Sequence, residues 1–330
     1  MIIKEVKLVR GFLLFCKEIN IITDQGKISF KKDWDSDLIG KINKKLTNFK
    51  IESLNDFGRL RNTLKELSTK QYNPLEINLF KSIIDPWRFV DSTVKQVPRP
   101  LSVIFTKNIG IHQFVVFSLN AKDFSGALNA NRQIADFLAK KIDNTTKQKD
   151  EEILMLIKEG IDEILDMVDF EVRVGVVFNN YFNGKYRYEG NELNKEEQYL
   201  YIAKLIEKYG VAYVENPFGE DDFDSYKKLL GQYRKICLIC MNSKINEYKQ
   251  GIDKKAFNTV VAKFEDISSF KIDVDSFKDE RLNIVVECNP EIVDLFVGLK
   301  IPLLKLEDTK IGSEVERTII SISEKIIVKH

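Results

Sequence analysis

The sequence predicts an α/β protein in which a (β/α)8 barrel with a ββαα start follows a small α+β domain. Three observations lead to this prediction. The chain has 330 residues, enough for one large domain with a smaller one attached. Its first part has the pattern of three strands and then three helices. From about Pro98 onward, short apolar runs alternate with helical patterns. We therefore expect two domains, residues 1–97 and 98–330.

The predicted first domain begins as a meander of three strands. The apolar patterns place these strands at residues 2–9, 12–22 and 27–30, with a turn at Asp24-Gln-Gly26. Apolar residues then recur at spacings of three and four over residues 35–49, 53–67 and 74–84, which predicts three helices. Strands followed by helices in this way are typical of a small α+β domain.

Eight apolar runs of four to eight residues make up the predicted barrel. They span residues 101–106, 113–118, 171–178, 211–215, 236–241, 259–263, 283–287 and 303–306. Too few residues join the first two runs for a crossover helix, so this pair must be antiparallel. Two helical patterns follow it, and the remaining runs alternate with single helices, an order that closes most naturally into a barrel. Ser313 and Glu316 predict a capping box at the start of the last helix.

Charge and cysteine content exclude several classes of function. Fifty-one Lys and Arg against fifty Asp and Glu leave a net charge of +1, so no overall charge favours nucleic acid or an anionic membrane. No stretch approaches a membrane span, and no signal peptide is predicted. Cys237 and Cys240 lie three apart in a predicted strand and face opposite sides, which indicates buried thiols rather than zinc ligands. We expect a cytoplasmic protein with reduced cysteines.

Histidine is scarce, and this limits the chemistry available. The chain has two histidines, His112 and His330. The chain therefore has very few histidines from which a Ser-His-Asp triad or a histidine-rich metal site could be built. In a barrel of this type the functional side chains lie where strands end and their loops begin. The residues at those positions are Gln113, Val177, Glu215, Met241, Asn242, Lys263, Glu287, Cys288 and Lys305.

The most distinctive phrase in the chain is Val214-Glu-Asn-Pro-Phe-Gly-Glu-Asp-Asp-Phe223. It resembles the enolase family, in which the corresponding strand ends in Glu-Asp-Pro-Phe and continues into Asp-Asp-Trp. The ββαα start is also that family's barrel signature. Further similar motifs follow in order: Val97-Pro-Arg-Pro100, Asn183-Gly-Lys-Tyr186, Val260-Val-Ala-Lys263, Asp294-Leu-Phe-Val-Gly-Leu-Lys300 and Ser313-Glu314. The resemblance covers the whole predicted barrel and implies an enolase-type fold.

The resemblance also implies a site, and the chain departs from it. Enolases bind Mg²⁺ through three carboxylates at successive strand ends and use the ion to stabilise an enolate. Of these ligand positions only Glu215 keeps a carboxylate. Val177 stands in the place of the first ligand, and Met241, followed by Asn242, in that of the third. We expect no cofactor, with Mg²⁺ only if some enolase-type activity remains.

The acid and base groups implied by the resemblance are reduced as well. Gln113 stands where the family has a glutamate, and an amide cannot exchange a proton. The family's Gly-Asp-Glu-Gly-Gly loop and its N-terminal Ser-Gly-Ala-Ser-Thr lid have no counterpart. Lys263 occupies the position of the family's proton-abstracting base, and Lys305 that of the lysine that neutralises the substrate.

The surviving residues allow two interpretations. Lys263 and Lys305 in one barrel mouth would lower each other's pKa and make a usable base. Alternatively, Glu215 and Glu287 pair with the two lysines in a neutral ionic cluster, the interpretation that we favour. The loss of two carboxylates makes the mouth more positive than that of an enolase. We therefore expect a small anion, such as a phosphate or carboxylate, to bind without metal among these four residues and Gln113.

Three functions follow from these interpretations. The favoured one is a non-catalytic binding or regulatory homologue that has lost phosphopyruvate hydratase activity. The second is an active lyase for 2-phosphoglycerate or an altered substrate, with Lys263 as base and Lys305 as anion stabiliser. The third is an enzyme that forms a Schiff base through Lys263. The resemblance also implies a homodimer, and neither nucleic acid nor membrane is an expected partner.

Overall fold

A computed structural model of the protein describes twelve segments of the chain. They are residues 1–10, 17–31, 36–66, 73–81, 94, 96–106, 110–142, 148–179, 181–188, 191–243, 245–307 and 309–328. Contacts divide the chain into two units. The first comprises Met1–Val94 with Phe264–Val274 and Asp294–Leu299, and the second Lys95–Lys263, Asp275–Val293 and Lys300–His330. The expected division into residues 1–97 and 98–330 stays a prediction.

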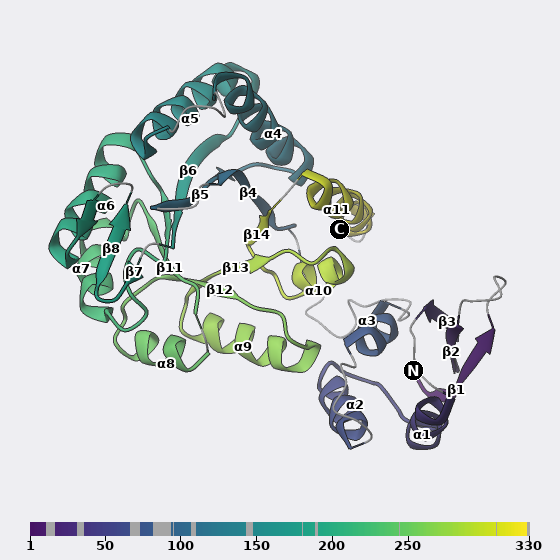
Figure 1. The fold of residues 1–330 in the computed structure, drawn as a ribbon. Coiled ribbons are helices and arrows are strands. Elements are labelled where there is room, and N and C mark those ends of the chain that lie inside the picture. Colours follow the sequence, from purple (N-terminus) through teal and green to yellow (C-terminus); the bar gives the residue numbers. More distant parts are fainter. Residues whose placement is uncertain are drawn as a thin grey trace. The chain divides into compact units, whose positions relative to one another are not determined.

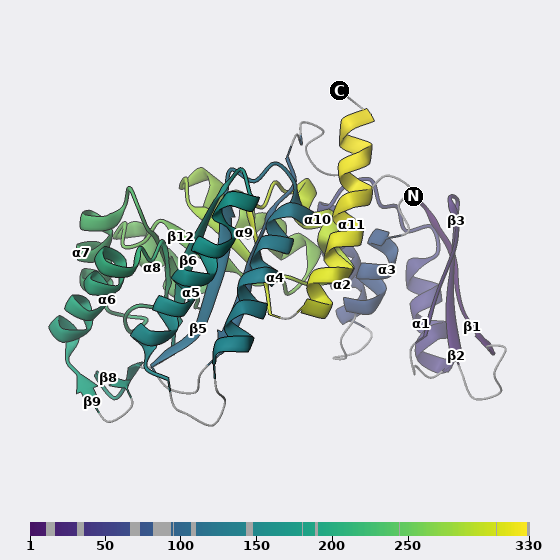
Figure 2. The ribbon, with the colours of Figure 1, turned by 90° about the horizontal axis from the view of Figure 1, so that it is seen from above.

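The first unit begins with an antiparallel sheet of three strands in the order β1-β2-β3. The strands are β1 (Ile3–Arg10), β2 (Lys17–Thr23) and β3 (Gly26–Lys31), and the helices that follow are α1 (Ser36–Leu46), α2 (Asn55–Lys65) and α3 (Asn73–Lys81). Helix α1 packs along β1 (Figure 2). Ile3, Ile19 and Ile42 are fully buried, so the apolar faces of sheet and helix form one core. The predicted meander with helices is confirmed, and residues 12–16, 35, 67 and 82–84 of the predicted elements lie outside the described residues.

The second unit is built on a closed barrel of eight strands, as predicted. The strands are β4 (Arg99–Thr106), β5 (Ile111–Leu119), β6 (Glu171–Phe178), β10 (Tyr213–Glu215), β11 (Leu238–Met241), β12 (Thr259–Ala262), β13 (Asn283–Glu287) and β14 (Leu303–Leu306). Strand β5 pairs antiparallel with β4 and β6, and every other pair in the barrel is parallel. The antiparallel start predicted from the short connection is therefore confirmed.

Helices alternate with these strands along the chain. They are α4 (Phe124–Lys141), α5 (Asp150–Ile164), α6 (Lys195–Tyr209), α7 (Phe223–Tyr233), α8 (Ile245–Asp253), α9 (Ile267–Asp279), α10 (Val293–Gly298) and α11 (Thr309–Val328), with 3₁₀ turns η2 (Leu165–Met167) and η3 (Pro290–Ile292). Figure 1 shows α4 to α8 and α11 outside the ring of strands. Within the described residues, no helix has the length and apolarity needed to cross a bilayer.

The predicted capping box at the last helix is wrong. Helix α11 begins at Thr309, so Ser313 lies in its second turn rather than at its start. Both residues of the supposed box contact Arg132 of α4 instead. Its guanidinium lies 2.9 Å from Ser313 Oγ and 3.1 Å from Glu316 Oε2. The Ser-x-x-Glu spacing places both side chains on the α11 face that meets α4.

A small sheet that the sequence analysis missed follows β6. Its strands are β7 (Tyr181–Phe182), β8 (Lys185–Tyr188) and β9 (Asn191–Leu193). The turn between β7 and β8 is Asn183-Gly184, with φ values of 49° and 81°. Two positive φ values define a type I′ turn, for which Asn-Gly is the preferred pair, so the dipeptide was the available signal.

The barrel interior is a packed apolar layer. It contains Leu101, Val115, Phe117, Val177, Ala212, Tyr213, Cys240, Val261, Val285 and Leu303, which together come from all eight strands or the residue before one. Gly175 allows this packing, because a Cβ there would lie 2.7 Å from Tyr213 Cβ and 2.8 Å from Val115 Cγ2. The barrel is thus filled at this level, and chemistry is confined to its ends.

Candidate functional site

A polar layer lies at the C-terminal ends of the barrel strands, one pleat above the apolar interior. Side chains on a strand alternate, so a residue two positions after an interior residue points to the same side. Five candidate residues stand in that relation to an interior residue of their own strand: Glu215, Asn242, Lys263, Glu287 and Lys305. Gln113 and Val177 pair across β5 and β6, and Val177 pairs with Glu215. The folded barrel therefore brings most predicted site residues to one end.

Glu215 and Lys305 form a buried ion pair at the centre of this layer. Lys305 Nζ lies 3.2 Å from Glu215 Oε1 and 3.1 Å from Oε2. Glu215 is 1% exposed and Lys305 3%. Water therefore screens the pair little, and each charge depends on the other for the solvation lost on burial. Lys305 contacts a carboxylate rather than Lys263.

Two further donors complete the shell of Glu215. Tyr213, on the same face of β10, donates its hydroxyl to Oε2 at 2.6 Å, and the Asn242 amide donates to Oε1 at 2.8 Å. Burial raises the pKa of Tyr213 well above its usual value, with Cys240 and Glu215 adding to the rise, so the hydroxyl stays protonated and donates. Each carboxylate oxygen thus has two donors. The sequence analysis missed Tyr213, although its place two residues before Glu215 was a signal.

The family's magnesium positions do not match a metal-binding shell in this chain. Val177 has no donor atom and belongs to the apolar interior. Met241 is buried on the strand face opposite to Cys240, so Asn242 rather than Met241 approaches Glu215. No cluster of three or more His, Cys, Asp or Glu suited to a metal occurs in the described residues. Since Glu215 already accepts from three side chains, these residues do not fit an octahedral Mg²⁺.

Lys263 and Glu287 lie at the outer edge of the layer. Both side chains are exposed, and Lys263 comes one residue after β12 rather than inside the strand. Glu287 pairs in register with Lys305, and its carboxylate accepts a 3.5 Å contact from the Asn242 amide. The proposed four-residue cluster therefore consists of one tight buried pair and two solvated charges.

Two acceptor atoms in the layer are buried without a hydrogen-bond partner in the described structure. They are Gln113 Oε1 and Asn242 Oδ1. A buried acceptor without a donor costs free energy, so a ligand with hydroxyl or amide donors would gain by binding there.

Cys237 and Cys240 are buried, as predicted, and Cys16 lies outside the described residues. Cys237 is 3% exposed and Cys240 is fully buried, and both are free thiols. Burial raises the pKa of each well above its usual value, and it raises that of Cys288 to about 12. Neutral thiols are poor metal ligands and poor nucleophiles, which agrees with a packing role.

Comparison with known proteins gives a consistent picture. Residues 106–283 match the family model for the enolase C-terminal TIM barrel domain. An enolase of Archaeoglobus fulgidus is 29% identical over 197 residues, which cover 51% of this chain and 48% of that protein. An enolase of Thermoplasma acidophilum is 24% identical over 244 residues, 64% of this chain and 61% of that protein. The chain thus spans about half to three-fifths of the length of these relatives.

Proposed function

The chain belongs to the enolase family, and we propose that it acts there as a non-catalytic binding protein that has lost phosphopyruvate hydratase activity. One observation carries this proposal. Glu215, the carboxylate left at the magnesium positions, is held by Lys305, Tyr213 and Asn242. A metal ion would have to displace a buried ammonium from it, and Val177 and Met241 would supply no second carboxylate.

The same contacts argue against the lyase mechanism of an enolase. Lys305 would have to neutralise a substrate anion, but its ammonium already lies about equally close to both oxygens of Glu215. Gln113 cannot act as a general acid. A base at Lys263 would therefore abstract a proton without a group to stabilise the resulting enolate, which is the costly part of that reaction.

What the mouth binds is the second part of the proposal. Lys263 presents an exposed ammonium there, while Gln113 and Asn242 each present a buried acceptor. A small anion that also carries hydroxyl groups would satisfy both, with its phosphate or carboxylate on Lys263 and a hydroxyl on an amide oxygen. A homodimer and a cytoplasmic location stay predictions, which size-exclusion chromatography with light scattering and cell fractionation would test.

A coupled assay with 2-phosphoglycerate tests the loss of activity. We expect no turnover above background at millimolar Mg²⁺, and none in Lys263→Met or in the control Lys235→Met, an exposed lysine away from the mouth. Turnover that Lys263→Met abolishes and Lys235→Met leaves unchanged would overturn the proposal in favour of the lyase. Borohydride trapping of a keto acid on Lys263, read by intact mass, would overturn it in favour of the Schiff-base enzyme.

Calorimetric titration tests the ligand. We expect phosphoglycerate to bind with and without Mg²⁺ at the same affinity, and Lys263→Met to weaken binding about tenfold. Absence of heat from phosphoglycerate, phosphoenolpyruvate and phosphate would remove the anion from the proposal and leave a mouth that binds none of them.

A further inference from the structure

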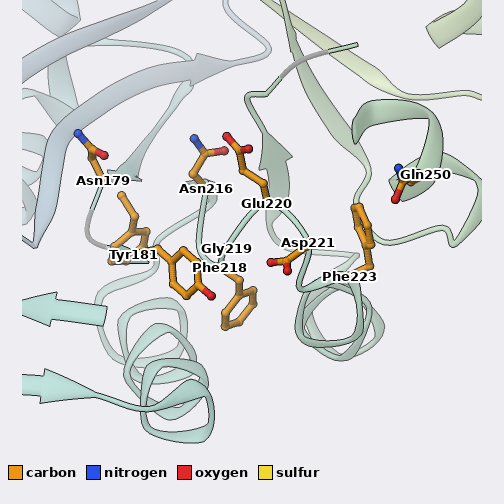
Figure 3. A pocket seen from close by; sticks show the side chains of 10 residues that line it. Asn179, Tyr181, Asn216, Phe218, Gly219, Glu220, Asp221, Phe223 and Gln250 are labelled. Atoms are coloured by element: carbon orange, nitrogen blue, oxygen red, sulfur yellow. The ribbon is translucent and has the colours of Figure 1, made fainter. Parts of the chain in front are cut away.

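A pocket that none of the polar-layer residues lines lies where the loops after β6 and β10 meet the starts of α7 and β7 (Figure 3). Its volume is about 560 Å³, within the range typical of small-molecule sites and far larger than a single ion needs. Four aromatic residues line it: Phe178, Tyr181, Phe218 and Phe223. Three are almost fully buried, whereas Tyr181 is 40% exposed at the rim.

The ring of Tyr181 forms one wall of the pocket and packs against Gly219. A Cβ at Gly219 would lie 2.7 Å from Tyr181 Cε1, so the glycine allows the ring to lie against the loop backbone. The Gly219 amide donates to Tyr186 Oη at 3.2 Å, and the rings of Tyr181 and Tyr186 lie 5.1 Å apart. The β7–β8 hairpin thus positions one wall of the pocket.

The charged residues of the pocket are both acidic. Glu220 and Asp221 line it, are exposed, and make no hydrogen bond or ion pair within the described part of the chain. Their neighbour Asp222 differs. It is buried, lies 3.0 Å from Lys195 Nζ and caps α7 through the Ser225 amide. Asp222 therefore makes the structural contacts of this acidic run. The carboxylates of Glu220 and Asp221 can contact a ligand in the pocket.

No lysine or arginine is found among the described lining residues, and the remaining polar side chains, Asn179, Asn216 and Gln250, are neutral amides. Lys195 and Lys254, which lie beside the lining, already have partners. Lys195 binds Asp222, and Lys254 Nζ lies 4.7 Å from the centroid of the Phe223 ring. The latter contact indicates that this wall accepts a positive charge. An anion would meet two carboxylates without a counter-charge in the pocket.

We propose that this pocket binds an organic cation, a guanidinium or alkylammonium group on an apolar stem. The head group would contact Glu220 and Asp221, and the stem would pack on Tyr181 and Phe218.

The site is connected to the barrel mouth through Asn216. Its amide donates to Asn242 O at 3.2 Å and accepts from Asn242 N at 2.8 Å. The proposal is independent of the fate of the hydratase activity, since none of these pocket residues belongs to the polar layer.

Titration calorimetry with agmatine tests the proposal on the full chain. We expect saturable binding at micromolar to millimolar concentration, weakened by added salt, and no binding of butylurea, which carries no charge. The double variant Glu220→Gln/Asp221→Asn keeps the shape of the lining and should weaken agmatine binding about tenfold or more. Asp224→Asn, an exposed acid of the same helix start outside the lining, should bind as the wild type does.

Two further variants sharpen the test. Tyr181→Ala removes the rim wall and should weaken binding while leaving the carboxylates in place. Lys254→Met removes the cation from Phe223 and should strengthen it. A short arginine-containing peptide that binds more tightly than agmatine would identify a partner's side chain as the source of the cation, and the reverse order a free amine. Absence of heat from both probes at about 10 mM, or equal affinity of wild type and the double variant, would overturn the proposal.

Discussion

Glu215 in the barrel and Glu76 in the first unit are each 1% exposed, yet the surrounding residues hold them differently. Glu215 accepts from Lys305, Tyr213 and Asn242 at 2.6–3.2 Å. Glu76 lies 3.8 Å from Arg61, and its Oε1 has no hydrogen-bond partner among the described residues. Burial is the same for both, so the number of donors decides how each carboxylate behaves.

The cause of the difference is competition for a cation. Arg61 lies closer to Asp266, at 2.8 Å, than to Glu76. Asp266 also accepts from the Ser269 amide at the start of α9. Burial therefore raises the pKa of Glu76 to about 7, with Arg61 lowering it and Asp266 raising it further. In the barrel, the Lys305 ammonium contacts the carboxylate of Glu215 at 3.1–3.2 Å. The comparison shows that, at equal burial, one carboxylate lies in a close ion pair and the other has a raised pKa.

The largest expected effect comes from removing the cation of the barrel pair. Lys305→Met leaves the buried Glu215 carboxyl group without its cation and should lower the free energy of unfolding by about 3–5 kcal/mol. The double variant Glu215→Gln/Lys305→Met removes both charges and should recover most of that loss. Urea unfolding of the wild type, Glu215→Gln, Lys305→Met and the double variant measures both values. Equal instability of the single and double variants would show that packing, not charge, is lost.

The next largest expected effect is a pH dependence of the free energy of unfolding that Glu76 causes. Its folded pKa of about 7 exceeds the ordinary value of 4.5, so the native state holds a proton that the unfolded chain releases. The free energy of unfolding should therefore fall as pH rises from about 5 to 7. Glu76→Gln should remove this slope and stabilise the protein at pH 8 by on the order of 2 kcal/mol. Thermal unfolding at pH 5 and 8 measures it, and the exposed Glu66→Gln should leave the slope unchanged.

A smaller effect is expected from one donor of Glu215. Tyr213→Phe removes the 2.6 Å hydrogen bond but leaves the ion pair and the ring, so it should cost about 1–2 kcal/mol. Unfolding in urea measures this cost. A loss as large as that of Lys305→Met would contradict the view that the lysine carries most of the stabilisation.

The smallest effect concerns the competitor of Glu76. Asp266→Asn keeps an oxygen for the Ser269 amide but removes the charge that raises the pKa of Glu76. Arg61 is then left with Glu76 as its charged partner. The midpoint of the pH-dependent loss of stability should move to lower pH by about one unit or less. An unchanged midpoint would mean that the charge of Asp266 does not contribute to the pKa of Glu76.

Local patterns determined much of this fold. Short apolar runs predicted the eight barrel strands, and the short link before Gln113 predicted the antiparallel start. Side chains alternate along a strand, so Glu215 and Lys305 lie on the inward side, because each follows an interior residue by two positions. These features follow from neighbours within one strand or one connection.

Closure of the barrel decided the rest. Glu215 and Lys305 lie 90 residues apart, and only the ring of strands brings their charges into contact. Closure also brought Asn242 rather than Met241 to Glu215, and the end of β12 at Ala262 left Lys263 exposed. The pocket of Glu220 and Asp221 needs a hairpin from another loop as its wall. The sequence by itself determined which residues reach the barrel mouth, whereas the tertiary structure decided which charges pair, because pairing depends on distances between strands that no local pattern encodes.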